Sequence, residues 1–212
     1  MTYYSLNDLD KQIEKFVDFD GGIFFEAGAN NGILFSNTAH FELDRGWSGV
    51  LVEPIPERAE EARKSRPNSK CFNAALVPAD YPDKVARLTY CNMMTVTWGE
   101  GRVFDGQDHL DKGLPHIARR NETPYDFTAP ARTISSILDE SGLDRVDFMS
   151  LDVEGYEVSA LRGLDIDRHF IKFMCVEAKG PGSLDMILET LQGRYETVAK
   201  LSGYDYLIER KE

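Results

Sequence analysis

The 212-residue sequence lacks three features that would each define a class of protein. No apolar run approaches the ~20 residues that a membrane-spanning helix needs, and the N-terminus has no signal-peptide layout. Only three cysteines occur, far apart and without a CxxC pair, which argues against a disulfide framework or zinc site and favours a cytoplasmic protein. Basic residues number 24 against 36 acidic ones, a formal net charge of −12, so the general attraction to nucleic acid is missing.

What the chain does contain is an alternation of short apolar segments with helix-like segments. The apolar segments, which predict strands, lie at 23–25, 50–52, 71–72, 147–151 and 173–176. The predicted helices lie at 36–45, from 56 to before 67, at 134–140, at 157–161 and at 184–191, and the segments 195–201 and 204–208 predict a hairpin. This order predicts a doubly wound α/β domain, with a mostly parallel sheet that ends in an antiparallel hairpin.

Two stretches stand outside this alternation within a single domain spanning 1–212. Residues 1–20 contain apolar residues at helical spacing and predict a packing helix in front of the main fold. Residues 97–130 are rich in Gly, Asp, Arg, Asn and Pro, and predict an irregular lid or substrate loop. His109 and His116 lie there and are interpreted as solvated loop histidines.

The strongest motif is the turn after the first predicted strand, which reads Glu26-Ala-Gly-Ala-Asn-Asn-Gly32. Its glycines allow a sharp turn and let a ligand approach the backbone at the carboxyl end of the sheet, where open α/β sheets bind ligands. Glu53, 21 residues after Gly32, ends the second strand and can accept hydrogen bonds from both hydroxyls of a ribose. Together these features predict an adenosine-containing ligand.

The glycine positions distinguish between adenosine cofactors. A dinucleotide fingerprint needs glycine where Asn30 and Ile33 stand, and no P-loop sequence is present. The remaining pattern, E-x-G-x-x-x-G, is associated with S-adenosylmethionine. We therefore expect Gly28, Ala29, Asn30 and Gly32 to surround its methionine part and Glu26 to lie near its amino group. Glu53 with Pro54 would take the ribose, and Asn73 and Ala74 would lie near the adenine.

Acidic residues also end two later strands. Asp152 and Glu177 are expected to enter the same crevice, where two carboxylates can position a substrate hydroxyl and accept its proton. They are the predicted catalytic residues, whereas Glu154 or Glu157 is expected to cap the following helix. The carboxylates allow a divalent ion, although no ligand spacing in the sequence requires one.

Several of these motifs together resemble the FkbM-type methyltransferases. They are the glycine turn, Val52-Glu53-Pro54, Ala74-Ala75-Leu76, Leu151-Asp-Val-Glu-Gly-Tyr-Glu157, Val176-Glu177 and Gly203-Tyr204. The resemblance implies a Rossmann-like class I methyltransferase fold with a seven-stranded sheet whose last strand is antiparallel. It also implies methyl transfer from S-adenosylmethionine, typically to a hydroxyl.

The sequence thus favours an S-adenosylmethionine-dependent O-methyltransferase acting on a small molecule, sugar or glycan. Three alternatives stay open. They are a nicotinamide-dependent oxidoreductase, a non-catalytic S-adenosylmethionine-binding module, and a methyltransferase acting on nucleic acid or protein. The acidic balance argues against nucleic acid as the acceptor.

Overall fold

The computed structural model, which describes residues 2–211, contains a central sheet of seven strands. In spatial order they are β10 (Tyr195–Lys200), β11 (Asp205–Arg210), β9 (Phe170–Glu177), β8 (Arg145–Leu151), β1 (Ile23–Ala27), β2 (Ser48–Glu53) and β3 (Lys70–Asn73). All neighbouring pairs from β9 to β3 are parallel, whereas β11 is antiparallel to both β9 and β10. The predicted doubly wound sheet with its antiparallel C-terminal hairpin is confirmed.

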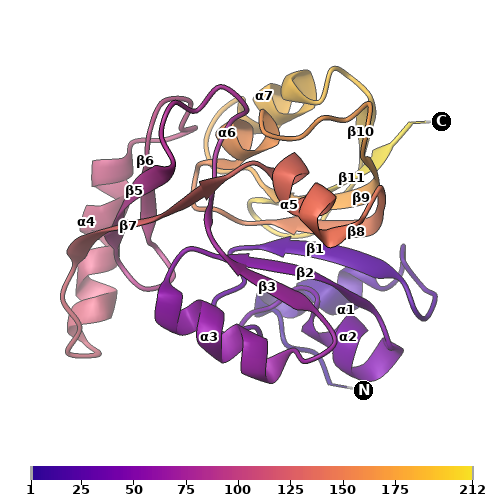
Figure 1. Ribbon diagram of the computed structural model, residues 1–212, viewed down its shortest axis with the longest axis horizontal. Coiled ribbons are helices and arrows are strands. Elements are labelled where there is room, and N and C mark those ends of the chain that lie inside the picture. The colour runs from indigo at the N-terminus through magenta and orange to yellow at the C-terminus, as the bar shows by residue number, and fades with distance from the viewer. Residues whose placement is uncertain (1, 212) are drawn as a thin grey trace.

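Helices cover both faces of this sheet (Figure 1). One side carries α1 (Leu9–Ile13), α2 (Ala39–Arg45) and α3 (Pro56–Ser65), and the other carries α5 (Ile134–Ser141), α6 (Glu157–Leu161) and α7 (Ser183–Thr190). Neighbouring side chains on β1 separate the two cores because successive strand residues point to opposite faces. Phe24 packs with Phe41 and Trp47 on the first side, and Phe25 packs with Ile134 on the second.

A second, four-stranded sheet is inserted between β3 and α5 and forms the left part of Figure 1. Its strands, in spatial order, are β4 (Ala75–Leu76), β7 (Tyr125–Arg132), β5 (Val85–Tyr90) and β6 (Val96–Trp98), and helix α4 (Gly106–Ala118) packs against it. Leu110 and Ile117 of α4 join Cys91 and Val96 in a small core. The insert therefore has apolar packing of its own, beside the two cores of the main sheet.

The structure corrects the expectation for residues 97–130. That stretch holds the end of β6, the whole of α4 and all but the last residues of β7, so it is largely regular. Asp105 caps α4 by accepting a hydrogen bond from the backbone N–H of Asp108 at 2.8 Å. The helix was missed because Gly106, Gly113 and Pro115 weaken the helical pattern, although Leu110 and Ile117 lie at helical spacing.

The N-terminal segment packs against the sheet, but its helical part is shorter than expected. A 3₁₀ turn, η1 (Leu6–Asp8), precedes α1, and its last two residues, Asn7 and Asp8, have left-handed backbone conformations. Leu9 and Ile13 are buried in the core on the α2 side. No helix within residues 2–211 is long and apolar enough to cross a membrane.

Candidate functional site

The turn after β1 is clamped between the ends of two neighbouring strands. The Gly28 N–H donates to Val52 O at 3.0 Å, and the Asp152 N–H donates to Ala27 O at 3.3 Å. Gly28 has φ +79°, and a Cβ there would lie 2.0 Å from the Asp152 carbonyl oxygen. Gly32 has φ +81°, and a Cβ there would lie 2.7 Å from Ser65 Oγ. The two glycines thus let this turn lie directly against β8 on one side and α3 on the other.

Glu53, at the end of β2, is held in a fixed orientation by backbone donors. Its Oε2 accepts from the Asn30 N–H at 2.8 Å and its Oε1 from the Ile55 N–H at 2.9 Å. Burial raises the pKa of Glu53 to about 7 despite these two hydrogen bonds. Asn73 supports the same turn, because its side-chain N–H₂ donates to the carbonyl oxygens of Glu53 and Pro54.

Glu26, the other acidic residue of the turn motif, is engaged elsewhere. Its carboxylate accepts hydrogen bonds from Ser36 Oγ, the Asn37 N–H and Thr38 Oγ1 at 2.7–3.0 Å, and Arg66 Nη1 lies 3.5 Å away. The side chain is buried and does not line the pocket described next. Its observed contacts join β1 to the segment that leads into α2.

A pocket opens at the carboxyl ends of β1, β2 and β8. The main sheet, its turns and α3 contribute Ala27, Gly28, Asn30, Leu34, Phe35, Val52, Glu53, Pro54, Ile55, Arg58, Ala74, Asp152, Val153, Glu154 and Tyr156. The insert contributes Ala75 and Leu76 of β4, Asn92, Met93 and Thr95 of the turn between β5 and β6, and Thr97 of β6. This mixture of apolar walls with a few polar groups is typical of a small-molecule site.

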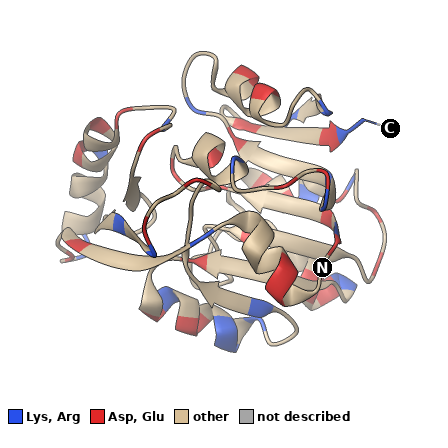
Figure 2. Ribbon diagram, turned by 45° about the horizontal axis from the view of Figure 1, so that its top comes forward, with Lys and Arg blue, Asp and Glu red and all other residues tan. Residues whose placement is uncertain are grey.

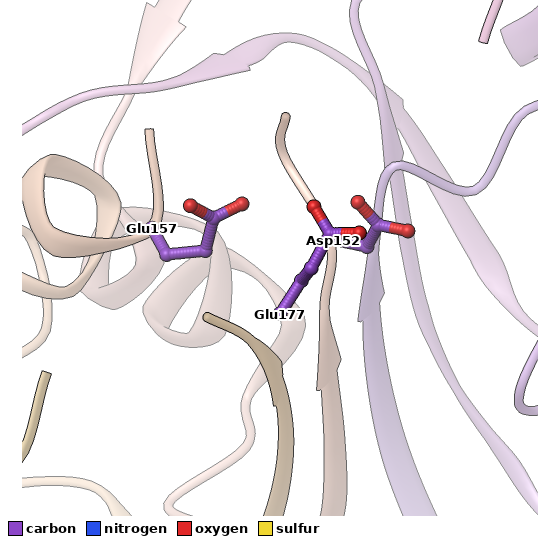
Figure 3. A group of neighbouring side chains, drawn as sticks. All are labelled: Asp152, Glu157 and Glu177. Carbon is purple, nitrogen blue, oxygen red and sulfur yellow. The ribbon is translucent and has the colours of Figure 1, made fainter. Parts of the chain in front are cut away.

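Three carboxylates converge beside this pocket: Asp152 after β8, Glu177 at the end of β9 and Glu157 at the start of α6 (Figure 3). One oxygen of each lies within 4.8 Å of the others. Burial, reinforced by the neighbouring Glu177 and Glu154, raises the pKa of Asp152 well above its ordinary value. Burial also raises the pKa of Glu177 to about 8 and that of Glu157 to about 7.

Glu154 also lines the pocket, and it contacts two basic side chains. Its Oε2 lies 2.9 Å from His109 Nε2 of α4 and 3.1 Å from Lys179 Nζ. Burial disfavours the ionised form, but these two contacts outweigh it and lower the pKa of Glu154. His109 is buried at 6% exposure, so its interpretation as a solvated loop histidine is wrong.

The insert holds the turn that follows β8 through its backbone. Arg102 Nη2 donates to the Glu154 carbonyl oxygen at 2.7 Å, and the Val103 N–H donates to the Gly155 carbonyl oxygen at 3.0 Å. The Phe104 ring lies so close to Gly155 that a Cβ there would be 2.4 Å from it. The insert thus contributes pocket-lining residues and also fixes the carboxylate-rich turn.

The structure brings together most of the residues predicted from the sequence. Gly28, Asn30, Glu53, Pro54, Ala74 and Asp152 line the pocket. Glu26, Ala29, Gly32, Asn73 and Glu177 lie behind its wall, where the first four pack or hydrogen-bond around the turns after β1 and β2. Asn92, Met93, Thr95 and Glu154 were missed as pocket residues. No local motif marks the first three, and Glu154 was one of the two residues expected to cap the following helix.

The sequence profile described as Methyltransferase FkbM domain matches residues 26–197. No curated protein sequence matches the chain significantly. Among solved structures, the chain is similar to a ribosomal protein L11 methylase from Lactobacillus delbrueckii subsp. bulgaricus, with 10% identity, 97% of this chain and 78% of that chain covered, and a TM-score of 0.48. It is also similar to a precorrin-6y C5,15-methyltransferase from Geobacter metallireducens, with 14% identity, coverage of 97% and 89%, and a TM-score of 0.46. A TehB-like S-adenosylmethionine-dependent methyltransferase from Corynebacterium glutamicum has 10% identity, coverage of 96% and 88%, and a TM-score of 0.44.

Proposed function

Because the chain belongs to the FkbM methyltransferase family and is an S-adenosylmethionine-dependent methyltransferase, we propose that it methylates a hydroxyl oxygen of a small molecule, sugar or glycan. The observation that carries this proposal is the Asp152 carboxylate in the pocket wall, whose Oδ1 accepts no hydrogen bond from residues 2–211. The family match also removes the nicotinamide-dependent alternative.

The residues around the turn after β1 fit an adenosine-containing cosubstrate. The Glu53 carboxylate reaches the pocket with both oxygens oriented by backbone N–H groups, and it retains acceptor capacity for ribose hydroxyls. Pro54 and Ala74 provide apolar pocket wall beside it, where an adenine can lie. Gly28 leaves the backbone exposed to the ligand because no side chain fits there. S-adenosylmethionine supplies an electrophilic methyl group on a sulfonium sulfur when it is bound.

A hydroxyl acceptor needs a group that removes its proton. As the new oxygen–carbon bond forms and the sulfur–methyl bond breaks, the hydroxyl proton is transferred to the Asp152 carboxylate. Burial raises the pKa of Asp152, which makes its ionised carboxylate a stronger proton acceptor. Positioning the acceptor oxygen in line with the methyl group supplies the rest of the rate enhancement.

The insert side of the pocket supports a polyhydroxylated acceptor. The Asn92 amide nitrogen and the Thr95 hydroxyl hydrogen-bond within the protein. The Asn92 amide oxygen and the Thr97 hydroxyl can hydrogen-bond to hydroxyls of a ligand. Leu34, Phe35 and Met93 are 37–40% exposed and form an apolar surface in the same pocket. Sugars combine hydroxyls with apolar C–H faces, so they match both surfaces. Figure 2 shows acidic residues spread over helices, strand ends and loops, in keeping with the case against a polyanionic acceptor.

The test is methyl transfer from deuterated S-adenosylmethionine to a panel of hydroxyl, amine and thiol acceptors, analysed by mass spectrometry and NMR. We expect O-methylated products only. The Asp152→Asn variant should lose about 100-fold or more in rate through loss of the base, while S-adenosylhomocysteine still binds in calorimetric titration. Asp18→Asn, at an exposed side chain outside the pocket, is the control and should retain full activity.

Other outcomes separate the alternatives. Methylation of nitrogen or sulfur would contradict the proposed acceptor class. Binding of S-adenosylhomocysteine without transfer to any acceptor would favour a non-catalytic module. Full activity in Asp152→Asn would remove Asp152 from the base role.

A further inference from the structure

We propose that Asp152, Glu157 and Glu177 bind a divalent metal ion of the class that prefers oxygen ligands, such as Mg²⁺ or Mn²⁺. One carboxylate oxygen from each residue lies within 4.8 Å of the other two. Two oxygens on one ion are at most twice the metal–oxygen distance apart, about 4 Å for Mg²⁺ and about 5 Å for larger ions such as Ca²⁺, so a small inward movement of these side chains would suit Mg²⁺. Figure 3 shows the three side chains reaching the same region from β8, β9 and α6. Carboxylates suit Mg²⁺, Ca²⁺ and Mn²⁺ better than they suit softer metals.

Glu157 gives an independent indication that this group is built to hold a ligand. The residue is only 1% exposed, and its Oε1 accepts from the N–H groups of Val153 and Gly155 at 3.0 and 3.1 Å. These two bonds fix the carboxylate, while its Oε2 is buried and has no hydrogen-bond donor among residues 2–211. A buried carboxylate oxygen without a donor is costly, and a bound cation removes that cost.

Lys179 lies next to these three carboxylates but does not balance their charge. Its Nζ lies 2.7 Å from Glu177 Oε2 and 3.1 Å from Glu154 Oε2, so it serves one member of the group and one neighbour outside it. Asp152 and Glu157 form no ion pair within the described part of the chain. A single ammonium therefore leaves the group with an excess of negative charge that a divalent ion can neutralise.

The position of the group favours a small ion over an ammonium group of a larger ligand. Of the three residues, only Asp152 lines the pocket, and Glu157 and Glu177 lie behind it. A bulky cationic ligand in the pocket would contact Asp152 without reaching the buried Glu157 oxygen. Asp152 consequently connects the metal site to the pocket.

The existence of this metal site does not rest on the proposed O-methylation, but its use there does. A bound ion would favour the ionised form of the Asp152 carboxylate, which burial disfavours. Metal binding is therefore measured without any methyl acceptor, so its failure and the failure of the proposed function are separate results.

The experiment uses Mn²⁺ as the probe on full-length protein treated with EDTA and dialysed, at pH 8 and physiological ionic strength. Free Mn²⁺ is followed by electron paramagnetic resonance and the heat of binding by calorimetry. We expect one site per chain in the wild type. Glu157→Gln and Glu177→Gln should each weaken it at least about tenfold, and Mg²⁺ should compete for it.

The control is Asp18→Asn, which lies in a separate acidic surface group with Glu14, Asp20 and Asp44 and reports non-specific attraction to an acidic protein. It should leave Mn²⁺ affinity unchanged. Near-ultraviolet circular dichroism and S-adenosylhomocysteine binding confirm that each Gln variant is folded. The proposal is overturned if the wild type has no specific site, or if folded Glu157→Gln and Glu177→Gln bind Mn²⁺ as the wild type does.

Discussion

Two buried acidic sites flank the turn after β1 and differ in how their charge is balanced. Glu26, at 3% exposure, accepts hydrogen bonds from Ser36, Asn37 and Thr38, and the fully buried Arg66 lies 3.5 Å away. Glu157, at 1% exposure, belongs to a group of three carboxylates and keeps one oxygen without a donor among residues 2–211.

The difference separates a structural carboxylate from a candidate site. Around Glu26 the donors are matched to the carboxylate, and their hydrogen bonds join β1 to the segment before α2. Around Asp152, Glu157 and Glu177 the fold supplies too few donors, and the unsatisfied oxygens lie beside the pocket. A buried acidic residue is therefore a candidate functional residue when its carboxylate lacks hydrogen-bond donors, and burial by itself is not sufficient.

The largest effect that tests this comparison is expected at Glu26. Glu26→Ala should destabilise the protein by about 3–5 kcal/mol, because it leaves the buried donors of Ser36, Asn37 and Thr38 without their acceptor. Urea unfolding followed by circular dichroism measures the change. Glu26→Gln, which keeps an acceptor oxygen, should lose less. A loss below about 1 kcal/mol in the alanine variant would show that the network is not structural.

In contrast to Glu26→Ala, the Glu157→Gln variant should be more stable than the wild type, and the difference in stability should depend on pH. The pKa of Glu157 is about 7 in the folded protein against an ordinary value of 4.5. The folded state therefore binds the extra proton, and wild-type stability falls as pH rises from 4.5 to 7. Glutamine removes this loss while its amide oxygen can still accept from Val153 and Gly155.

In the presence of EDTA, Glu157→Gln should be more stable than the wild type by on the order of 2 kcal/mol at pH 8. The two proteins should be similar below pH 4.5, where both side chains are neutral. Thermal unfolding at both pH values measures the difference. A destabilised variant at pH 8 would mean that the carboxylate is satisfied after all.

The smallest expected effect concerns ligand affinity at Glu53, a buried acid whose carboxylate accepts two backbone hydrogen bonds. Its pKa of about 7 and its two backbone donors leave it ionised above neutrality with room for further hydrogen bonds. Affinity for S-adenosylhomocysteine should rise up to about tenfold between pH 6 and 8, because ionised Glu53 accepts stronger hydrogen bonds. Calorimetry should show a flatter pH dependence and weaker binding in Glu53→Gln. An unchanged pH profile would remove Glu53 from the binding site.

Most of the main sheet could be predicted because its signals are local. Short apolar segments that end in an acidic residue or a glycine turn predicted β1, β2, β8 and β9. Gly46 and Gly142 predicted the ends of α2 and α5. Helix α4 of the insert was not predicted in this way. The apolar face of α4 packs against Cys91, in the turn after β5, and Val96 of β6, which both precede the helix in the chain.

Neighbouring residues encode strand and turn patterns, so the sequence places Glu26, Glu53, Asp152 and Glu177 within one residue of a strand end. The role of each carboxylate, by contrast, follows from its contacts in the folded protein. Glu26 accepts three sets of hydrogen bonds and lies 3.5 Å from Arg66, an arginine that it shares with Glu42. Glu157 lies beside Asp152 and Glu177 and forms no ion pair within residues 2–211. Charge balance is set by contacts between distant segments, and no local pattern records those contacts.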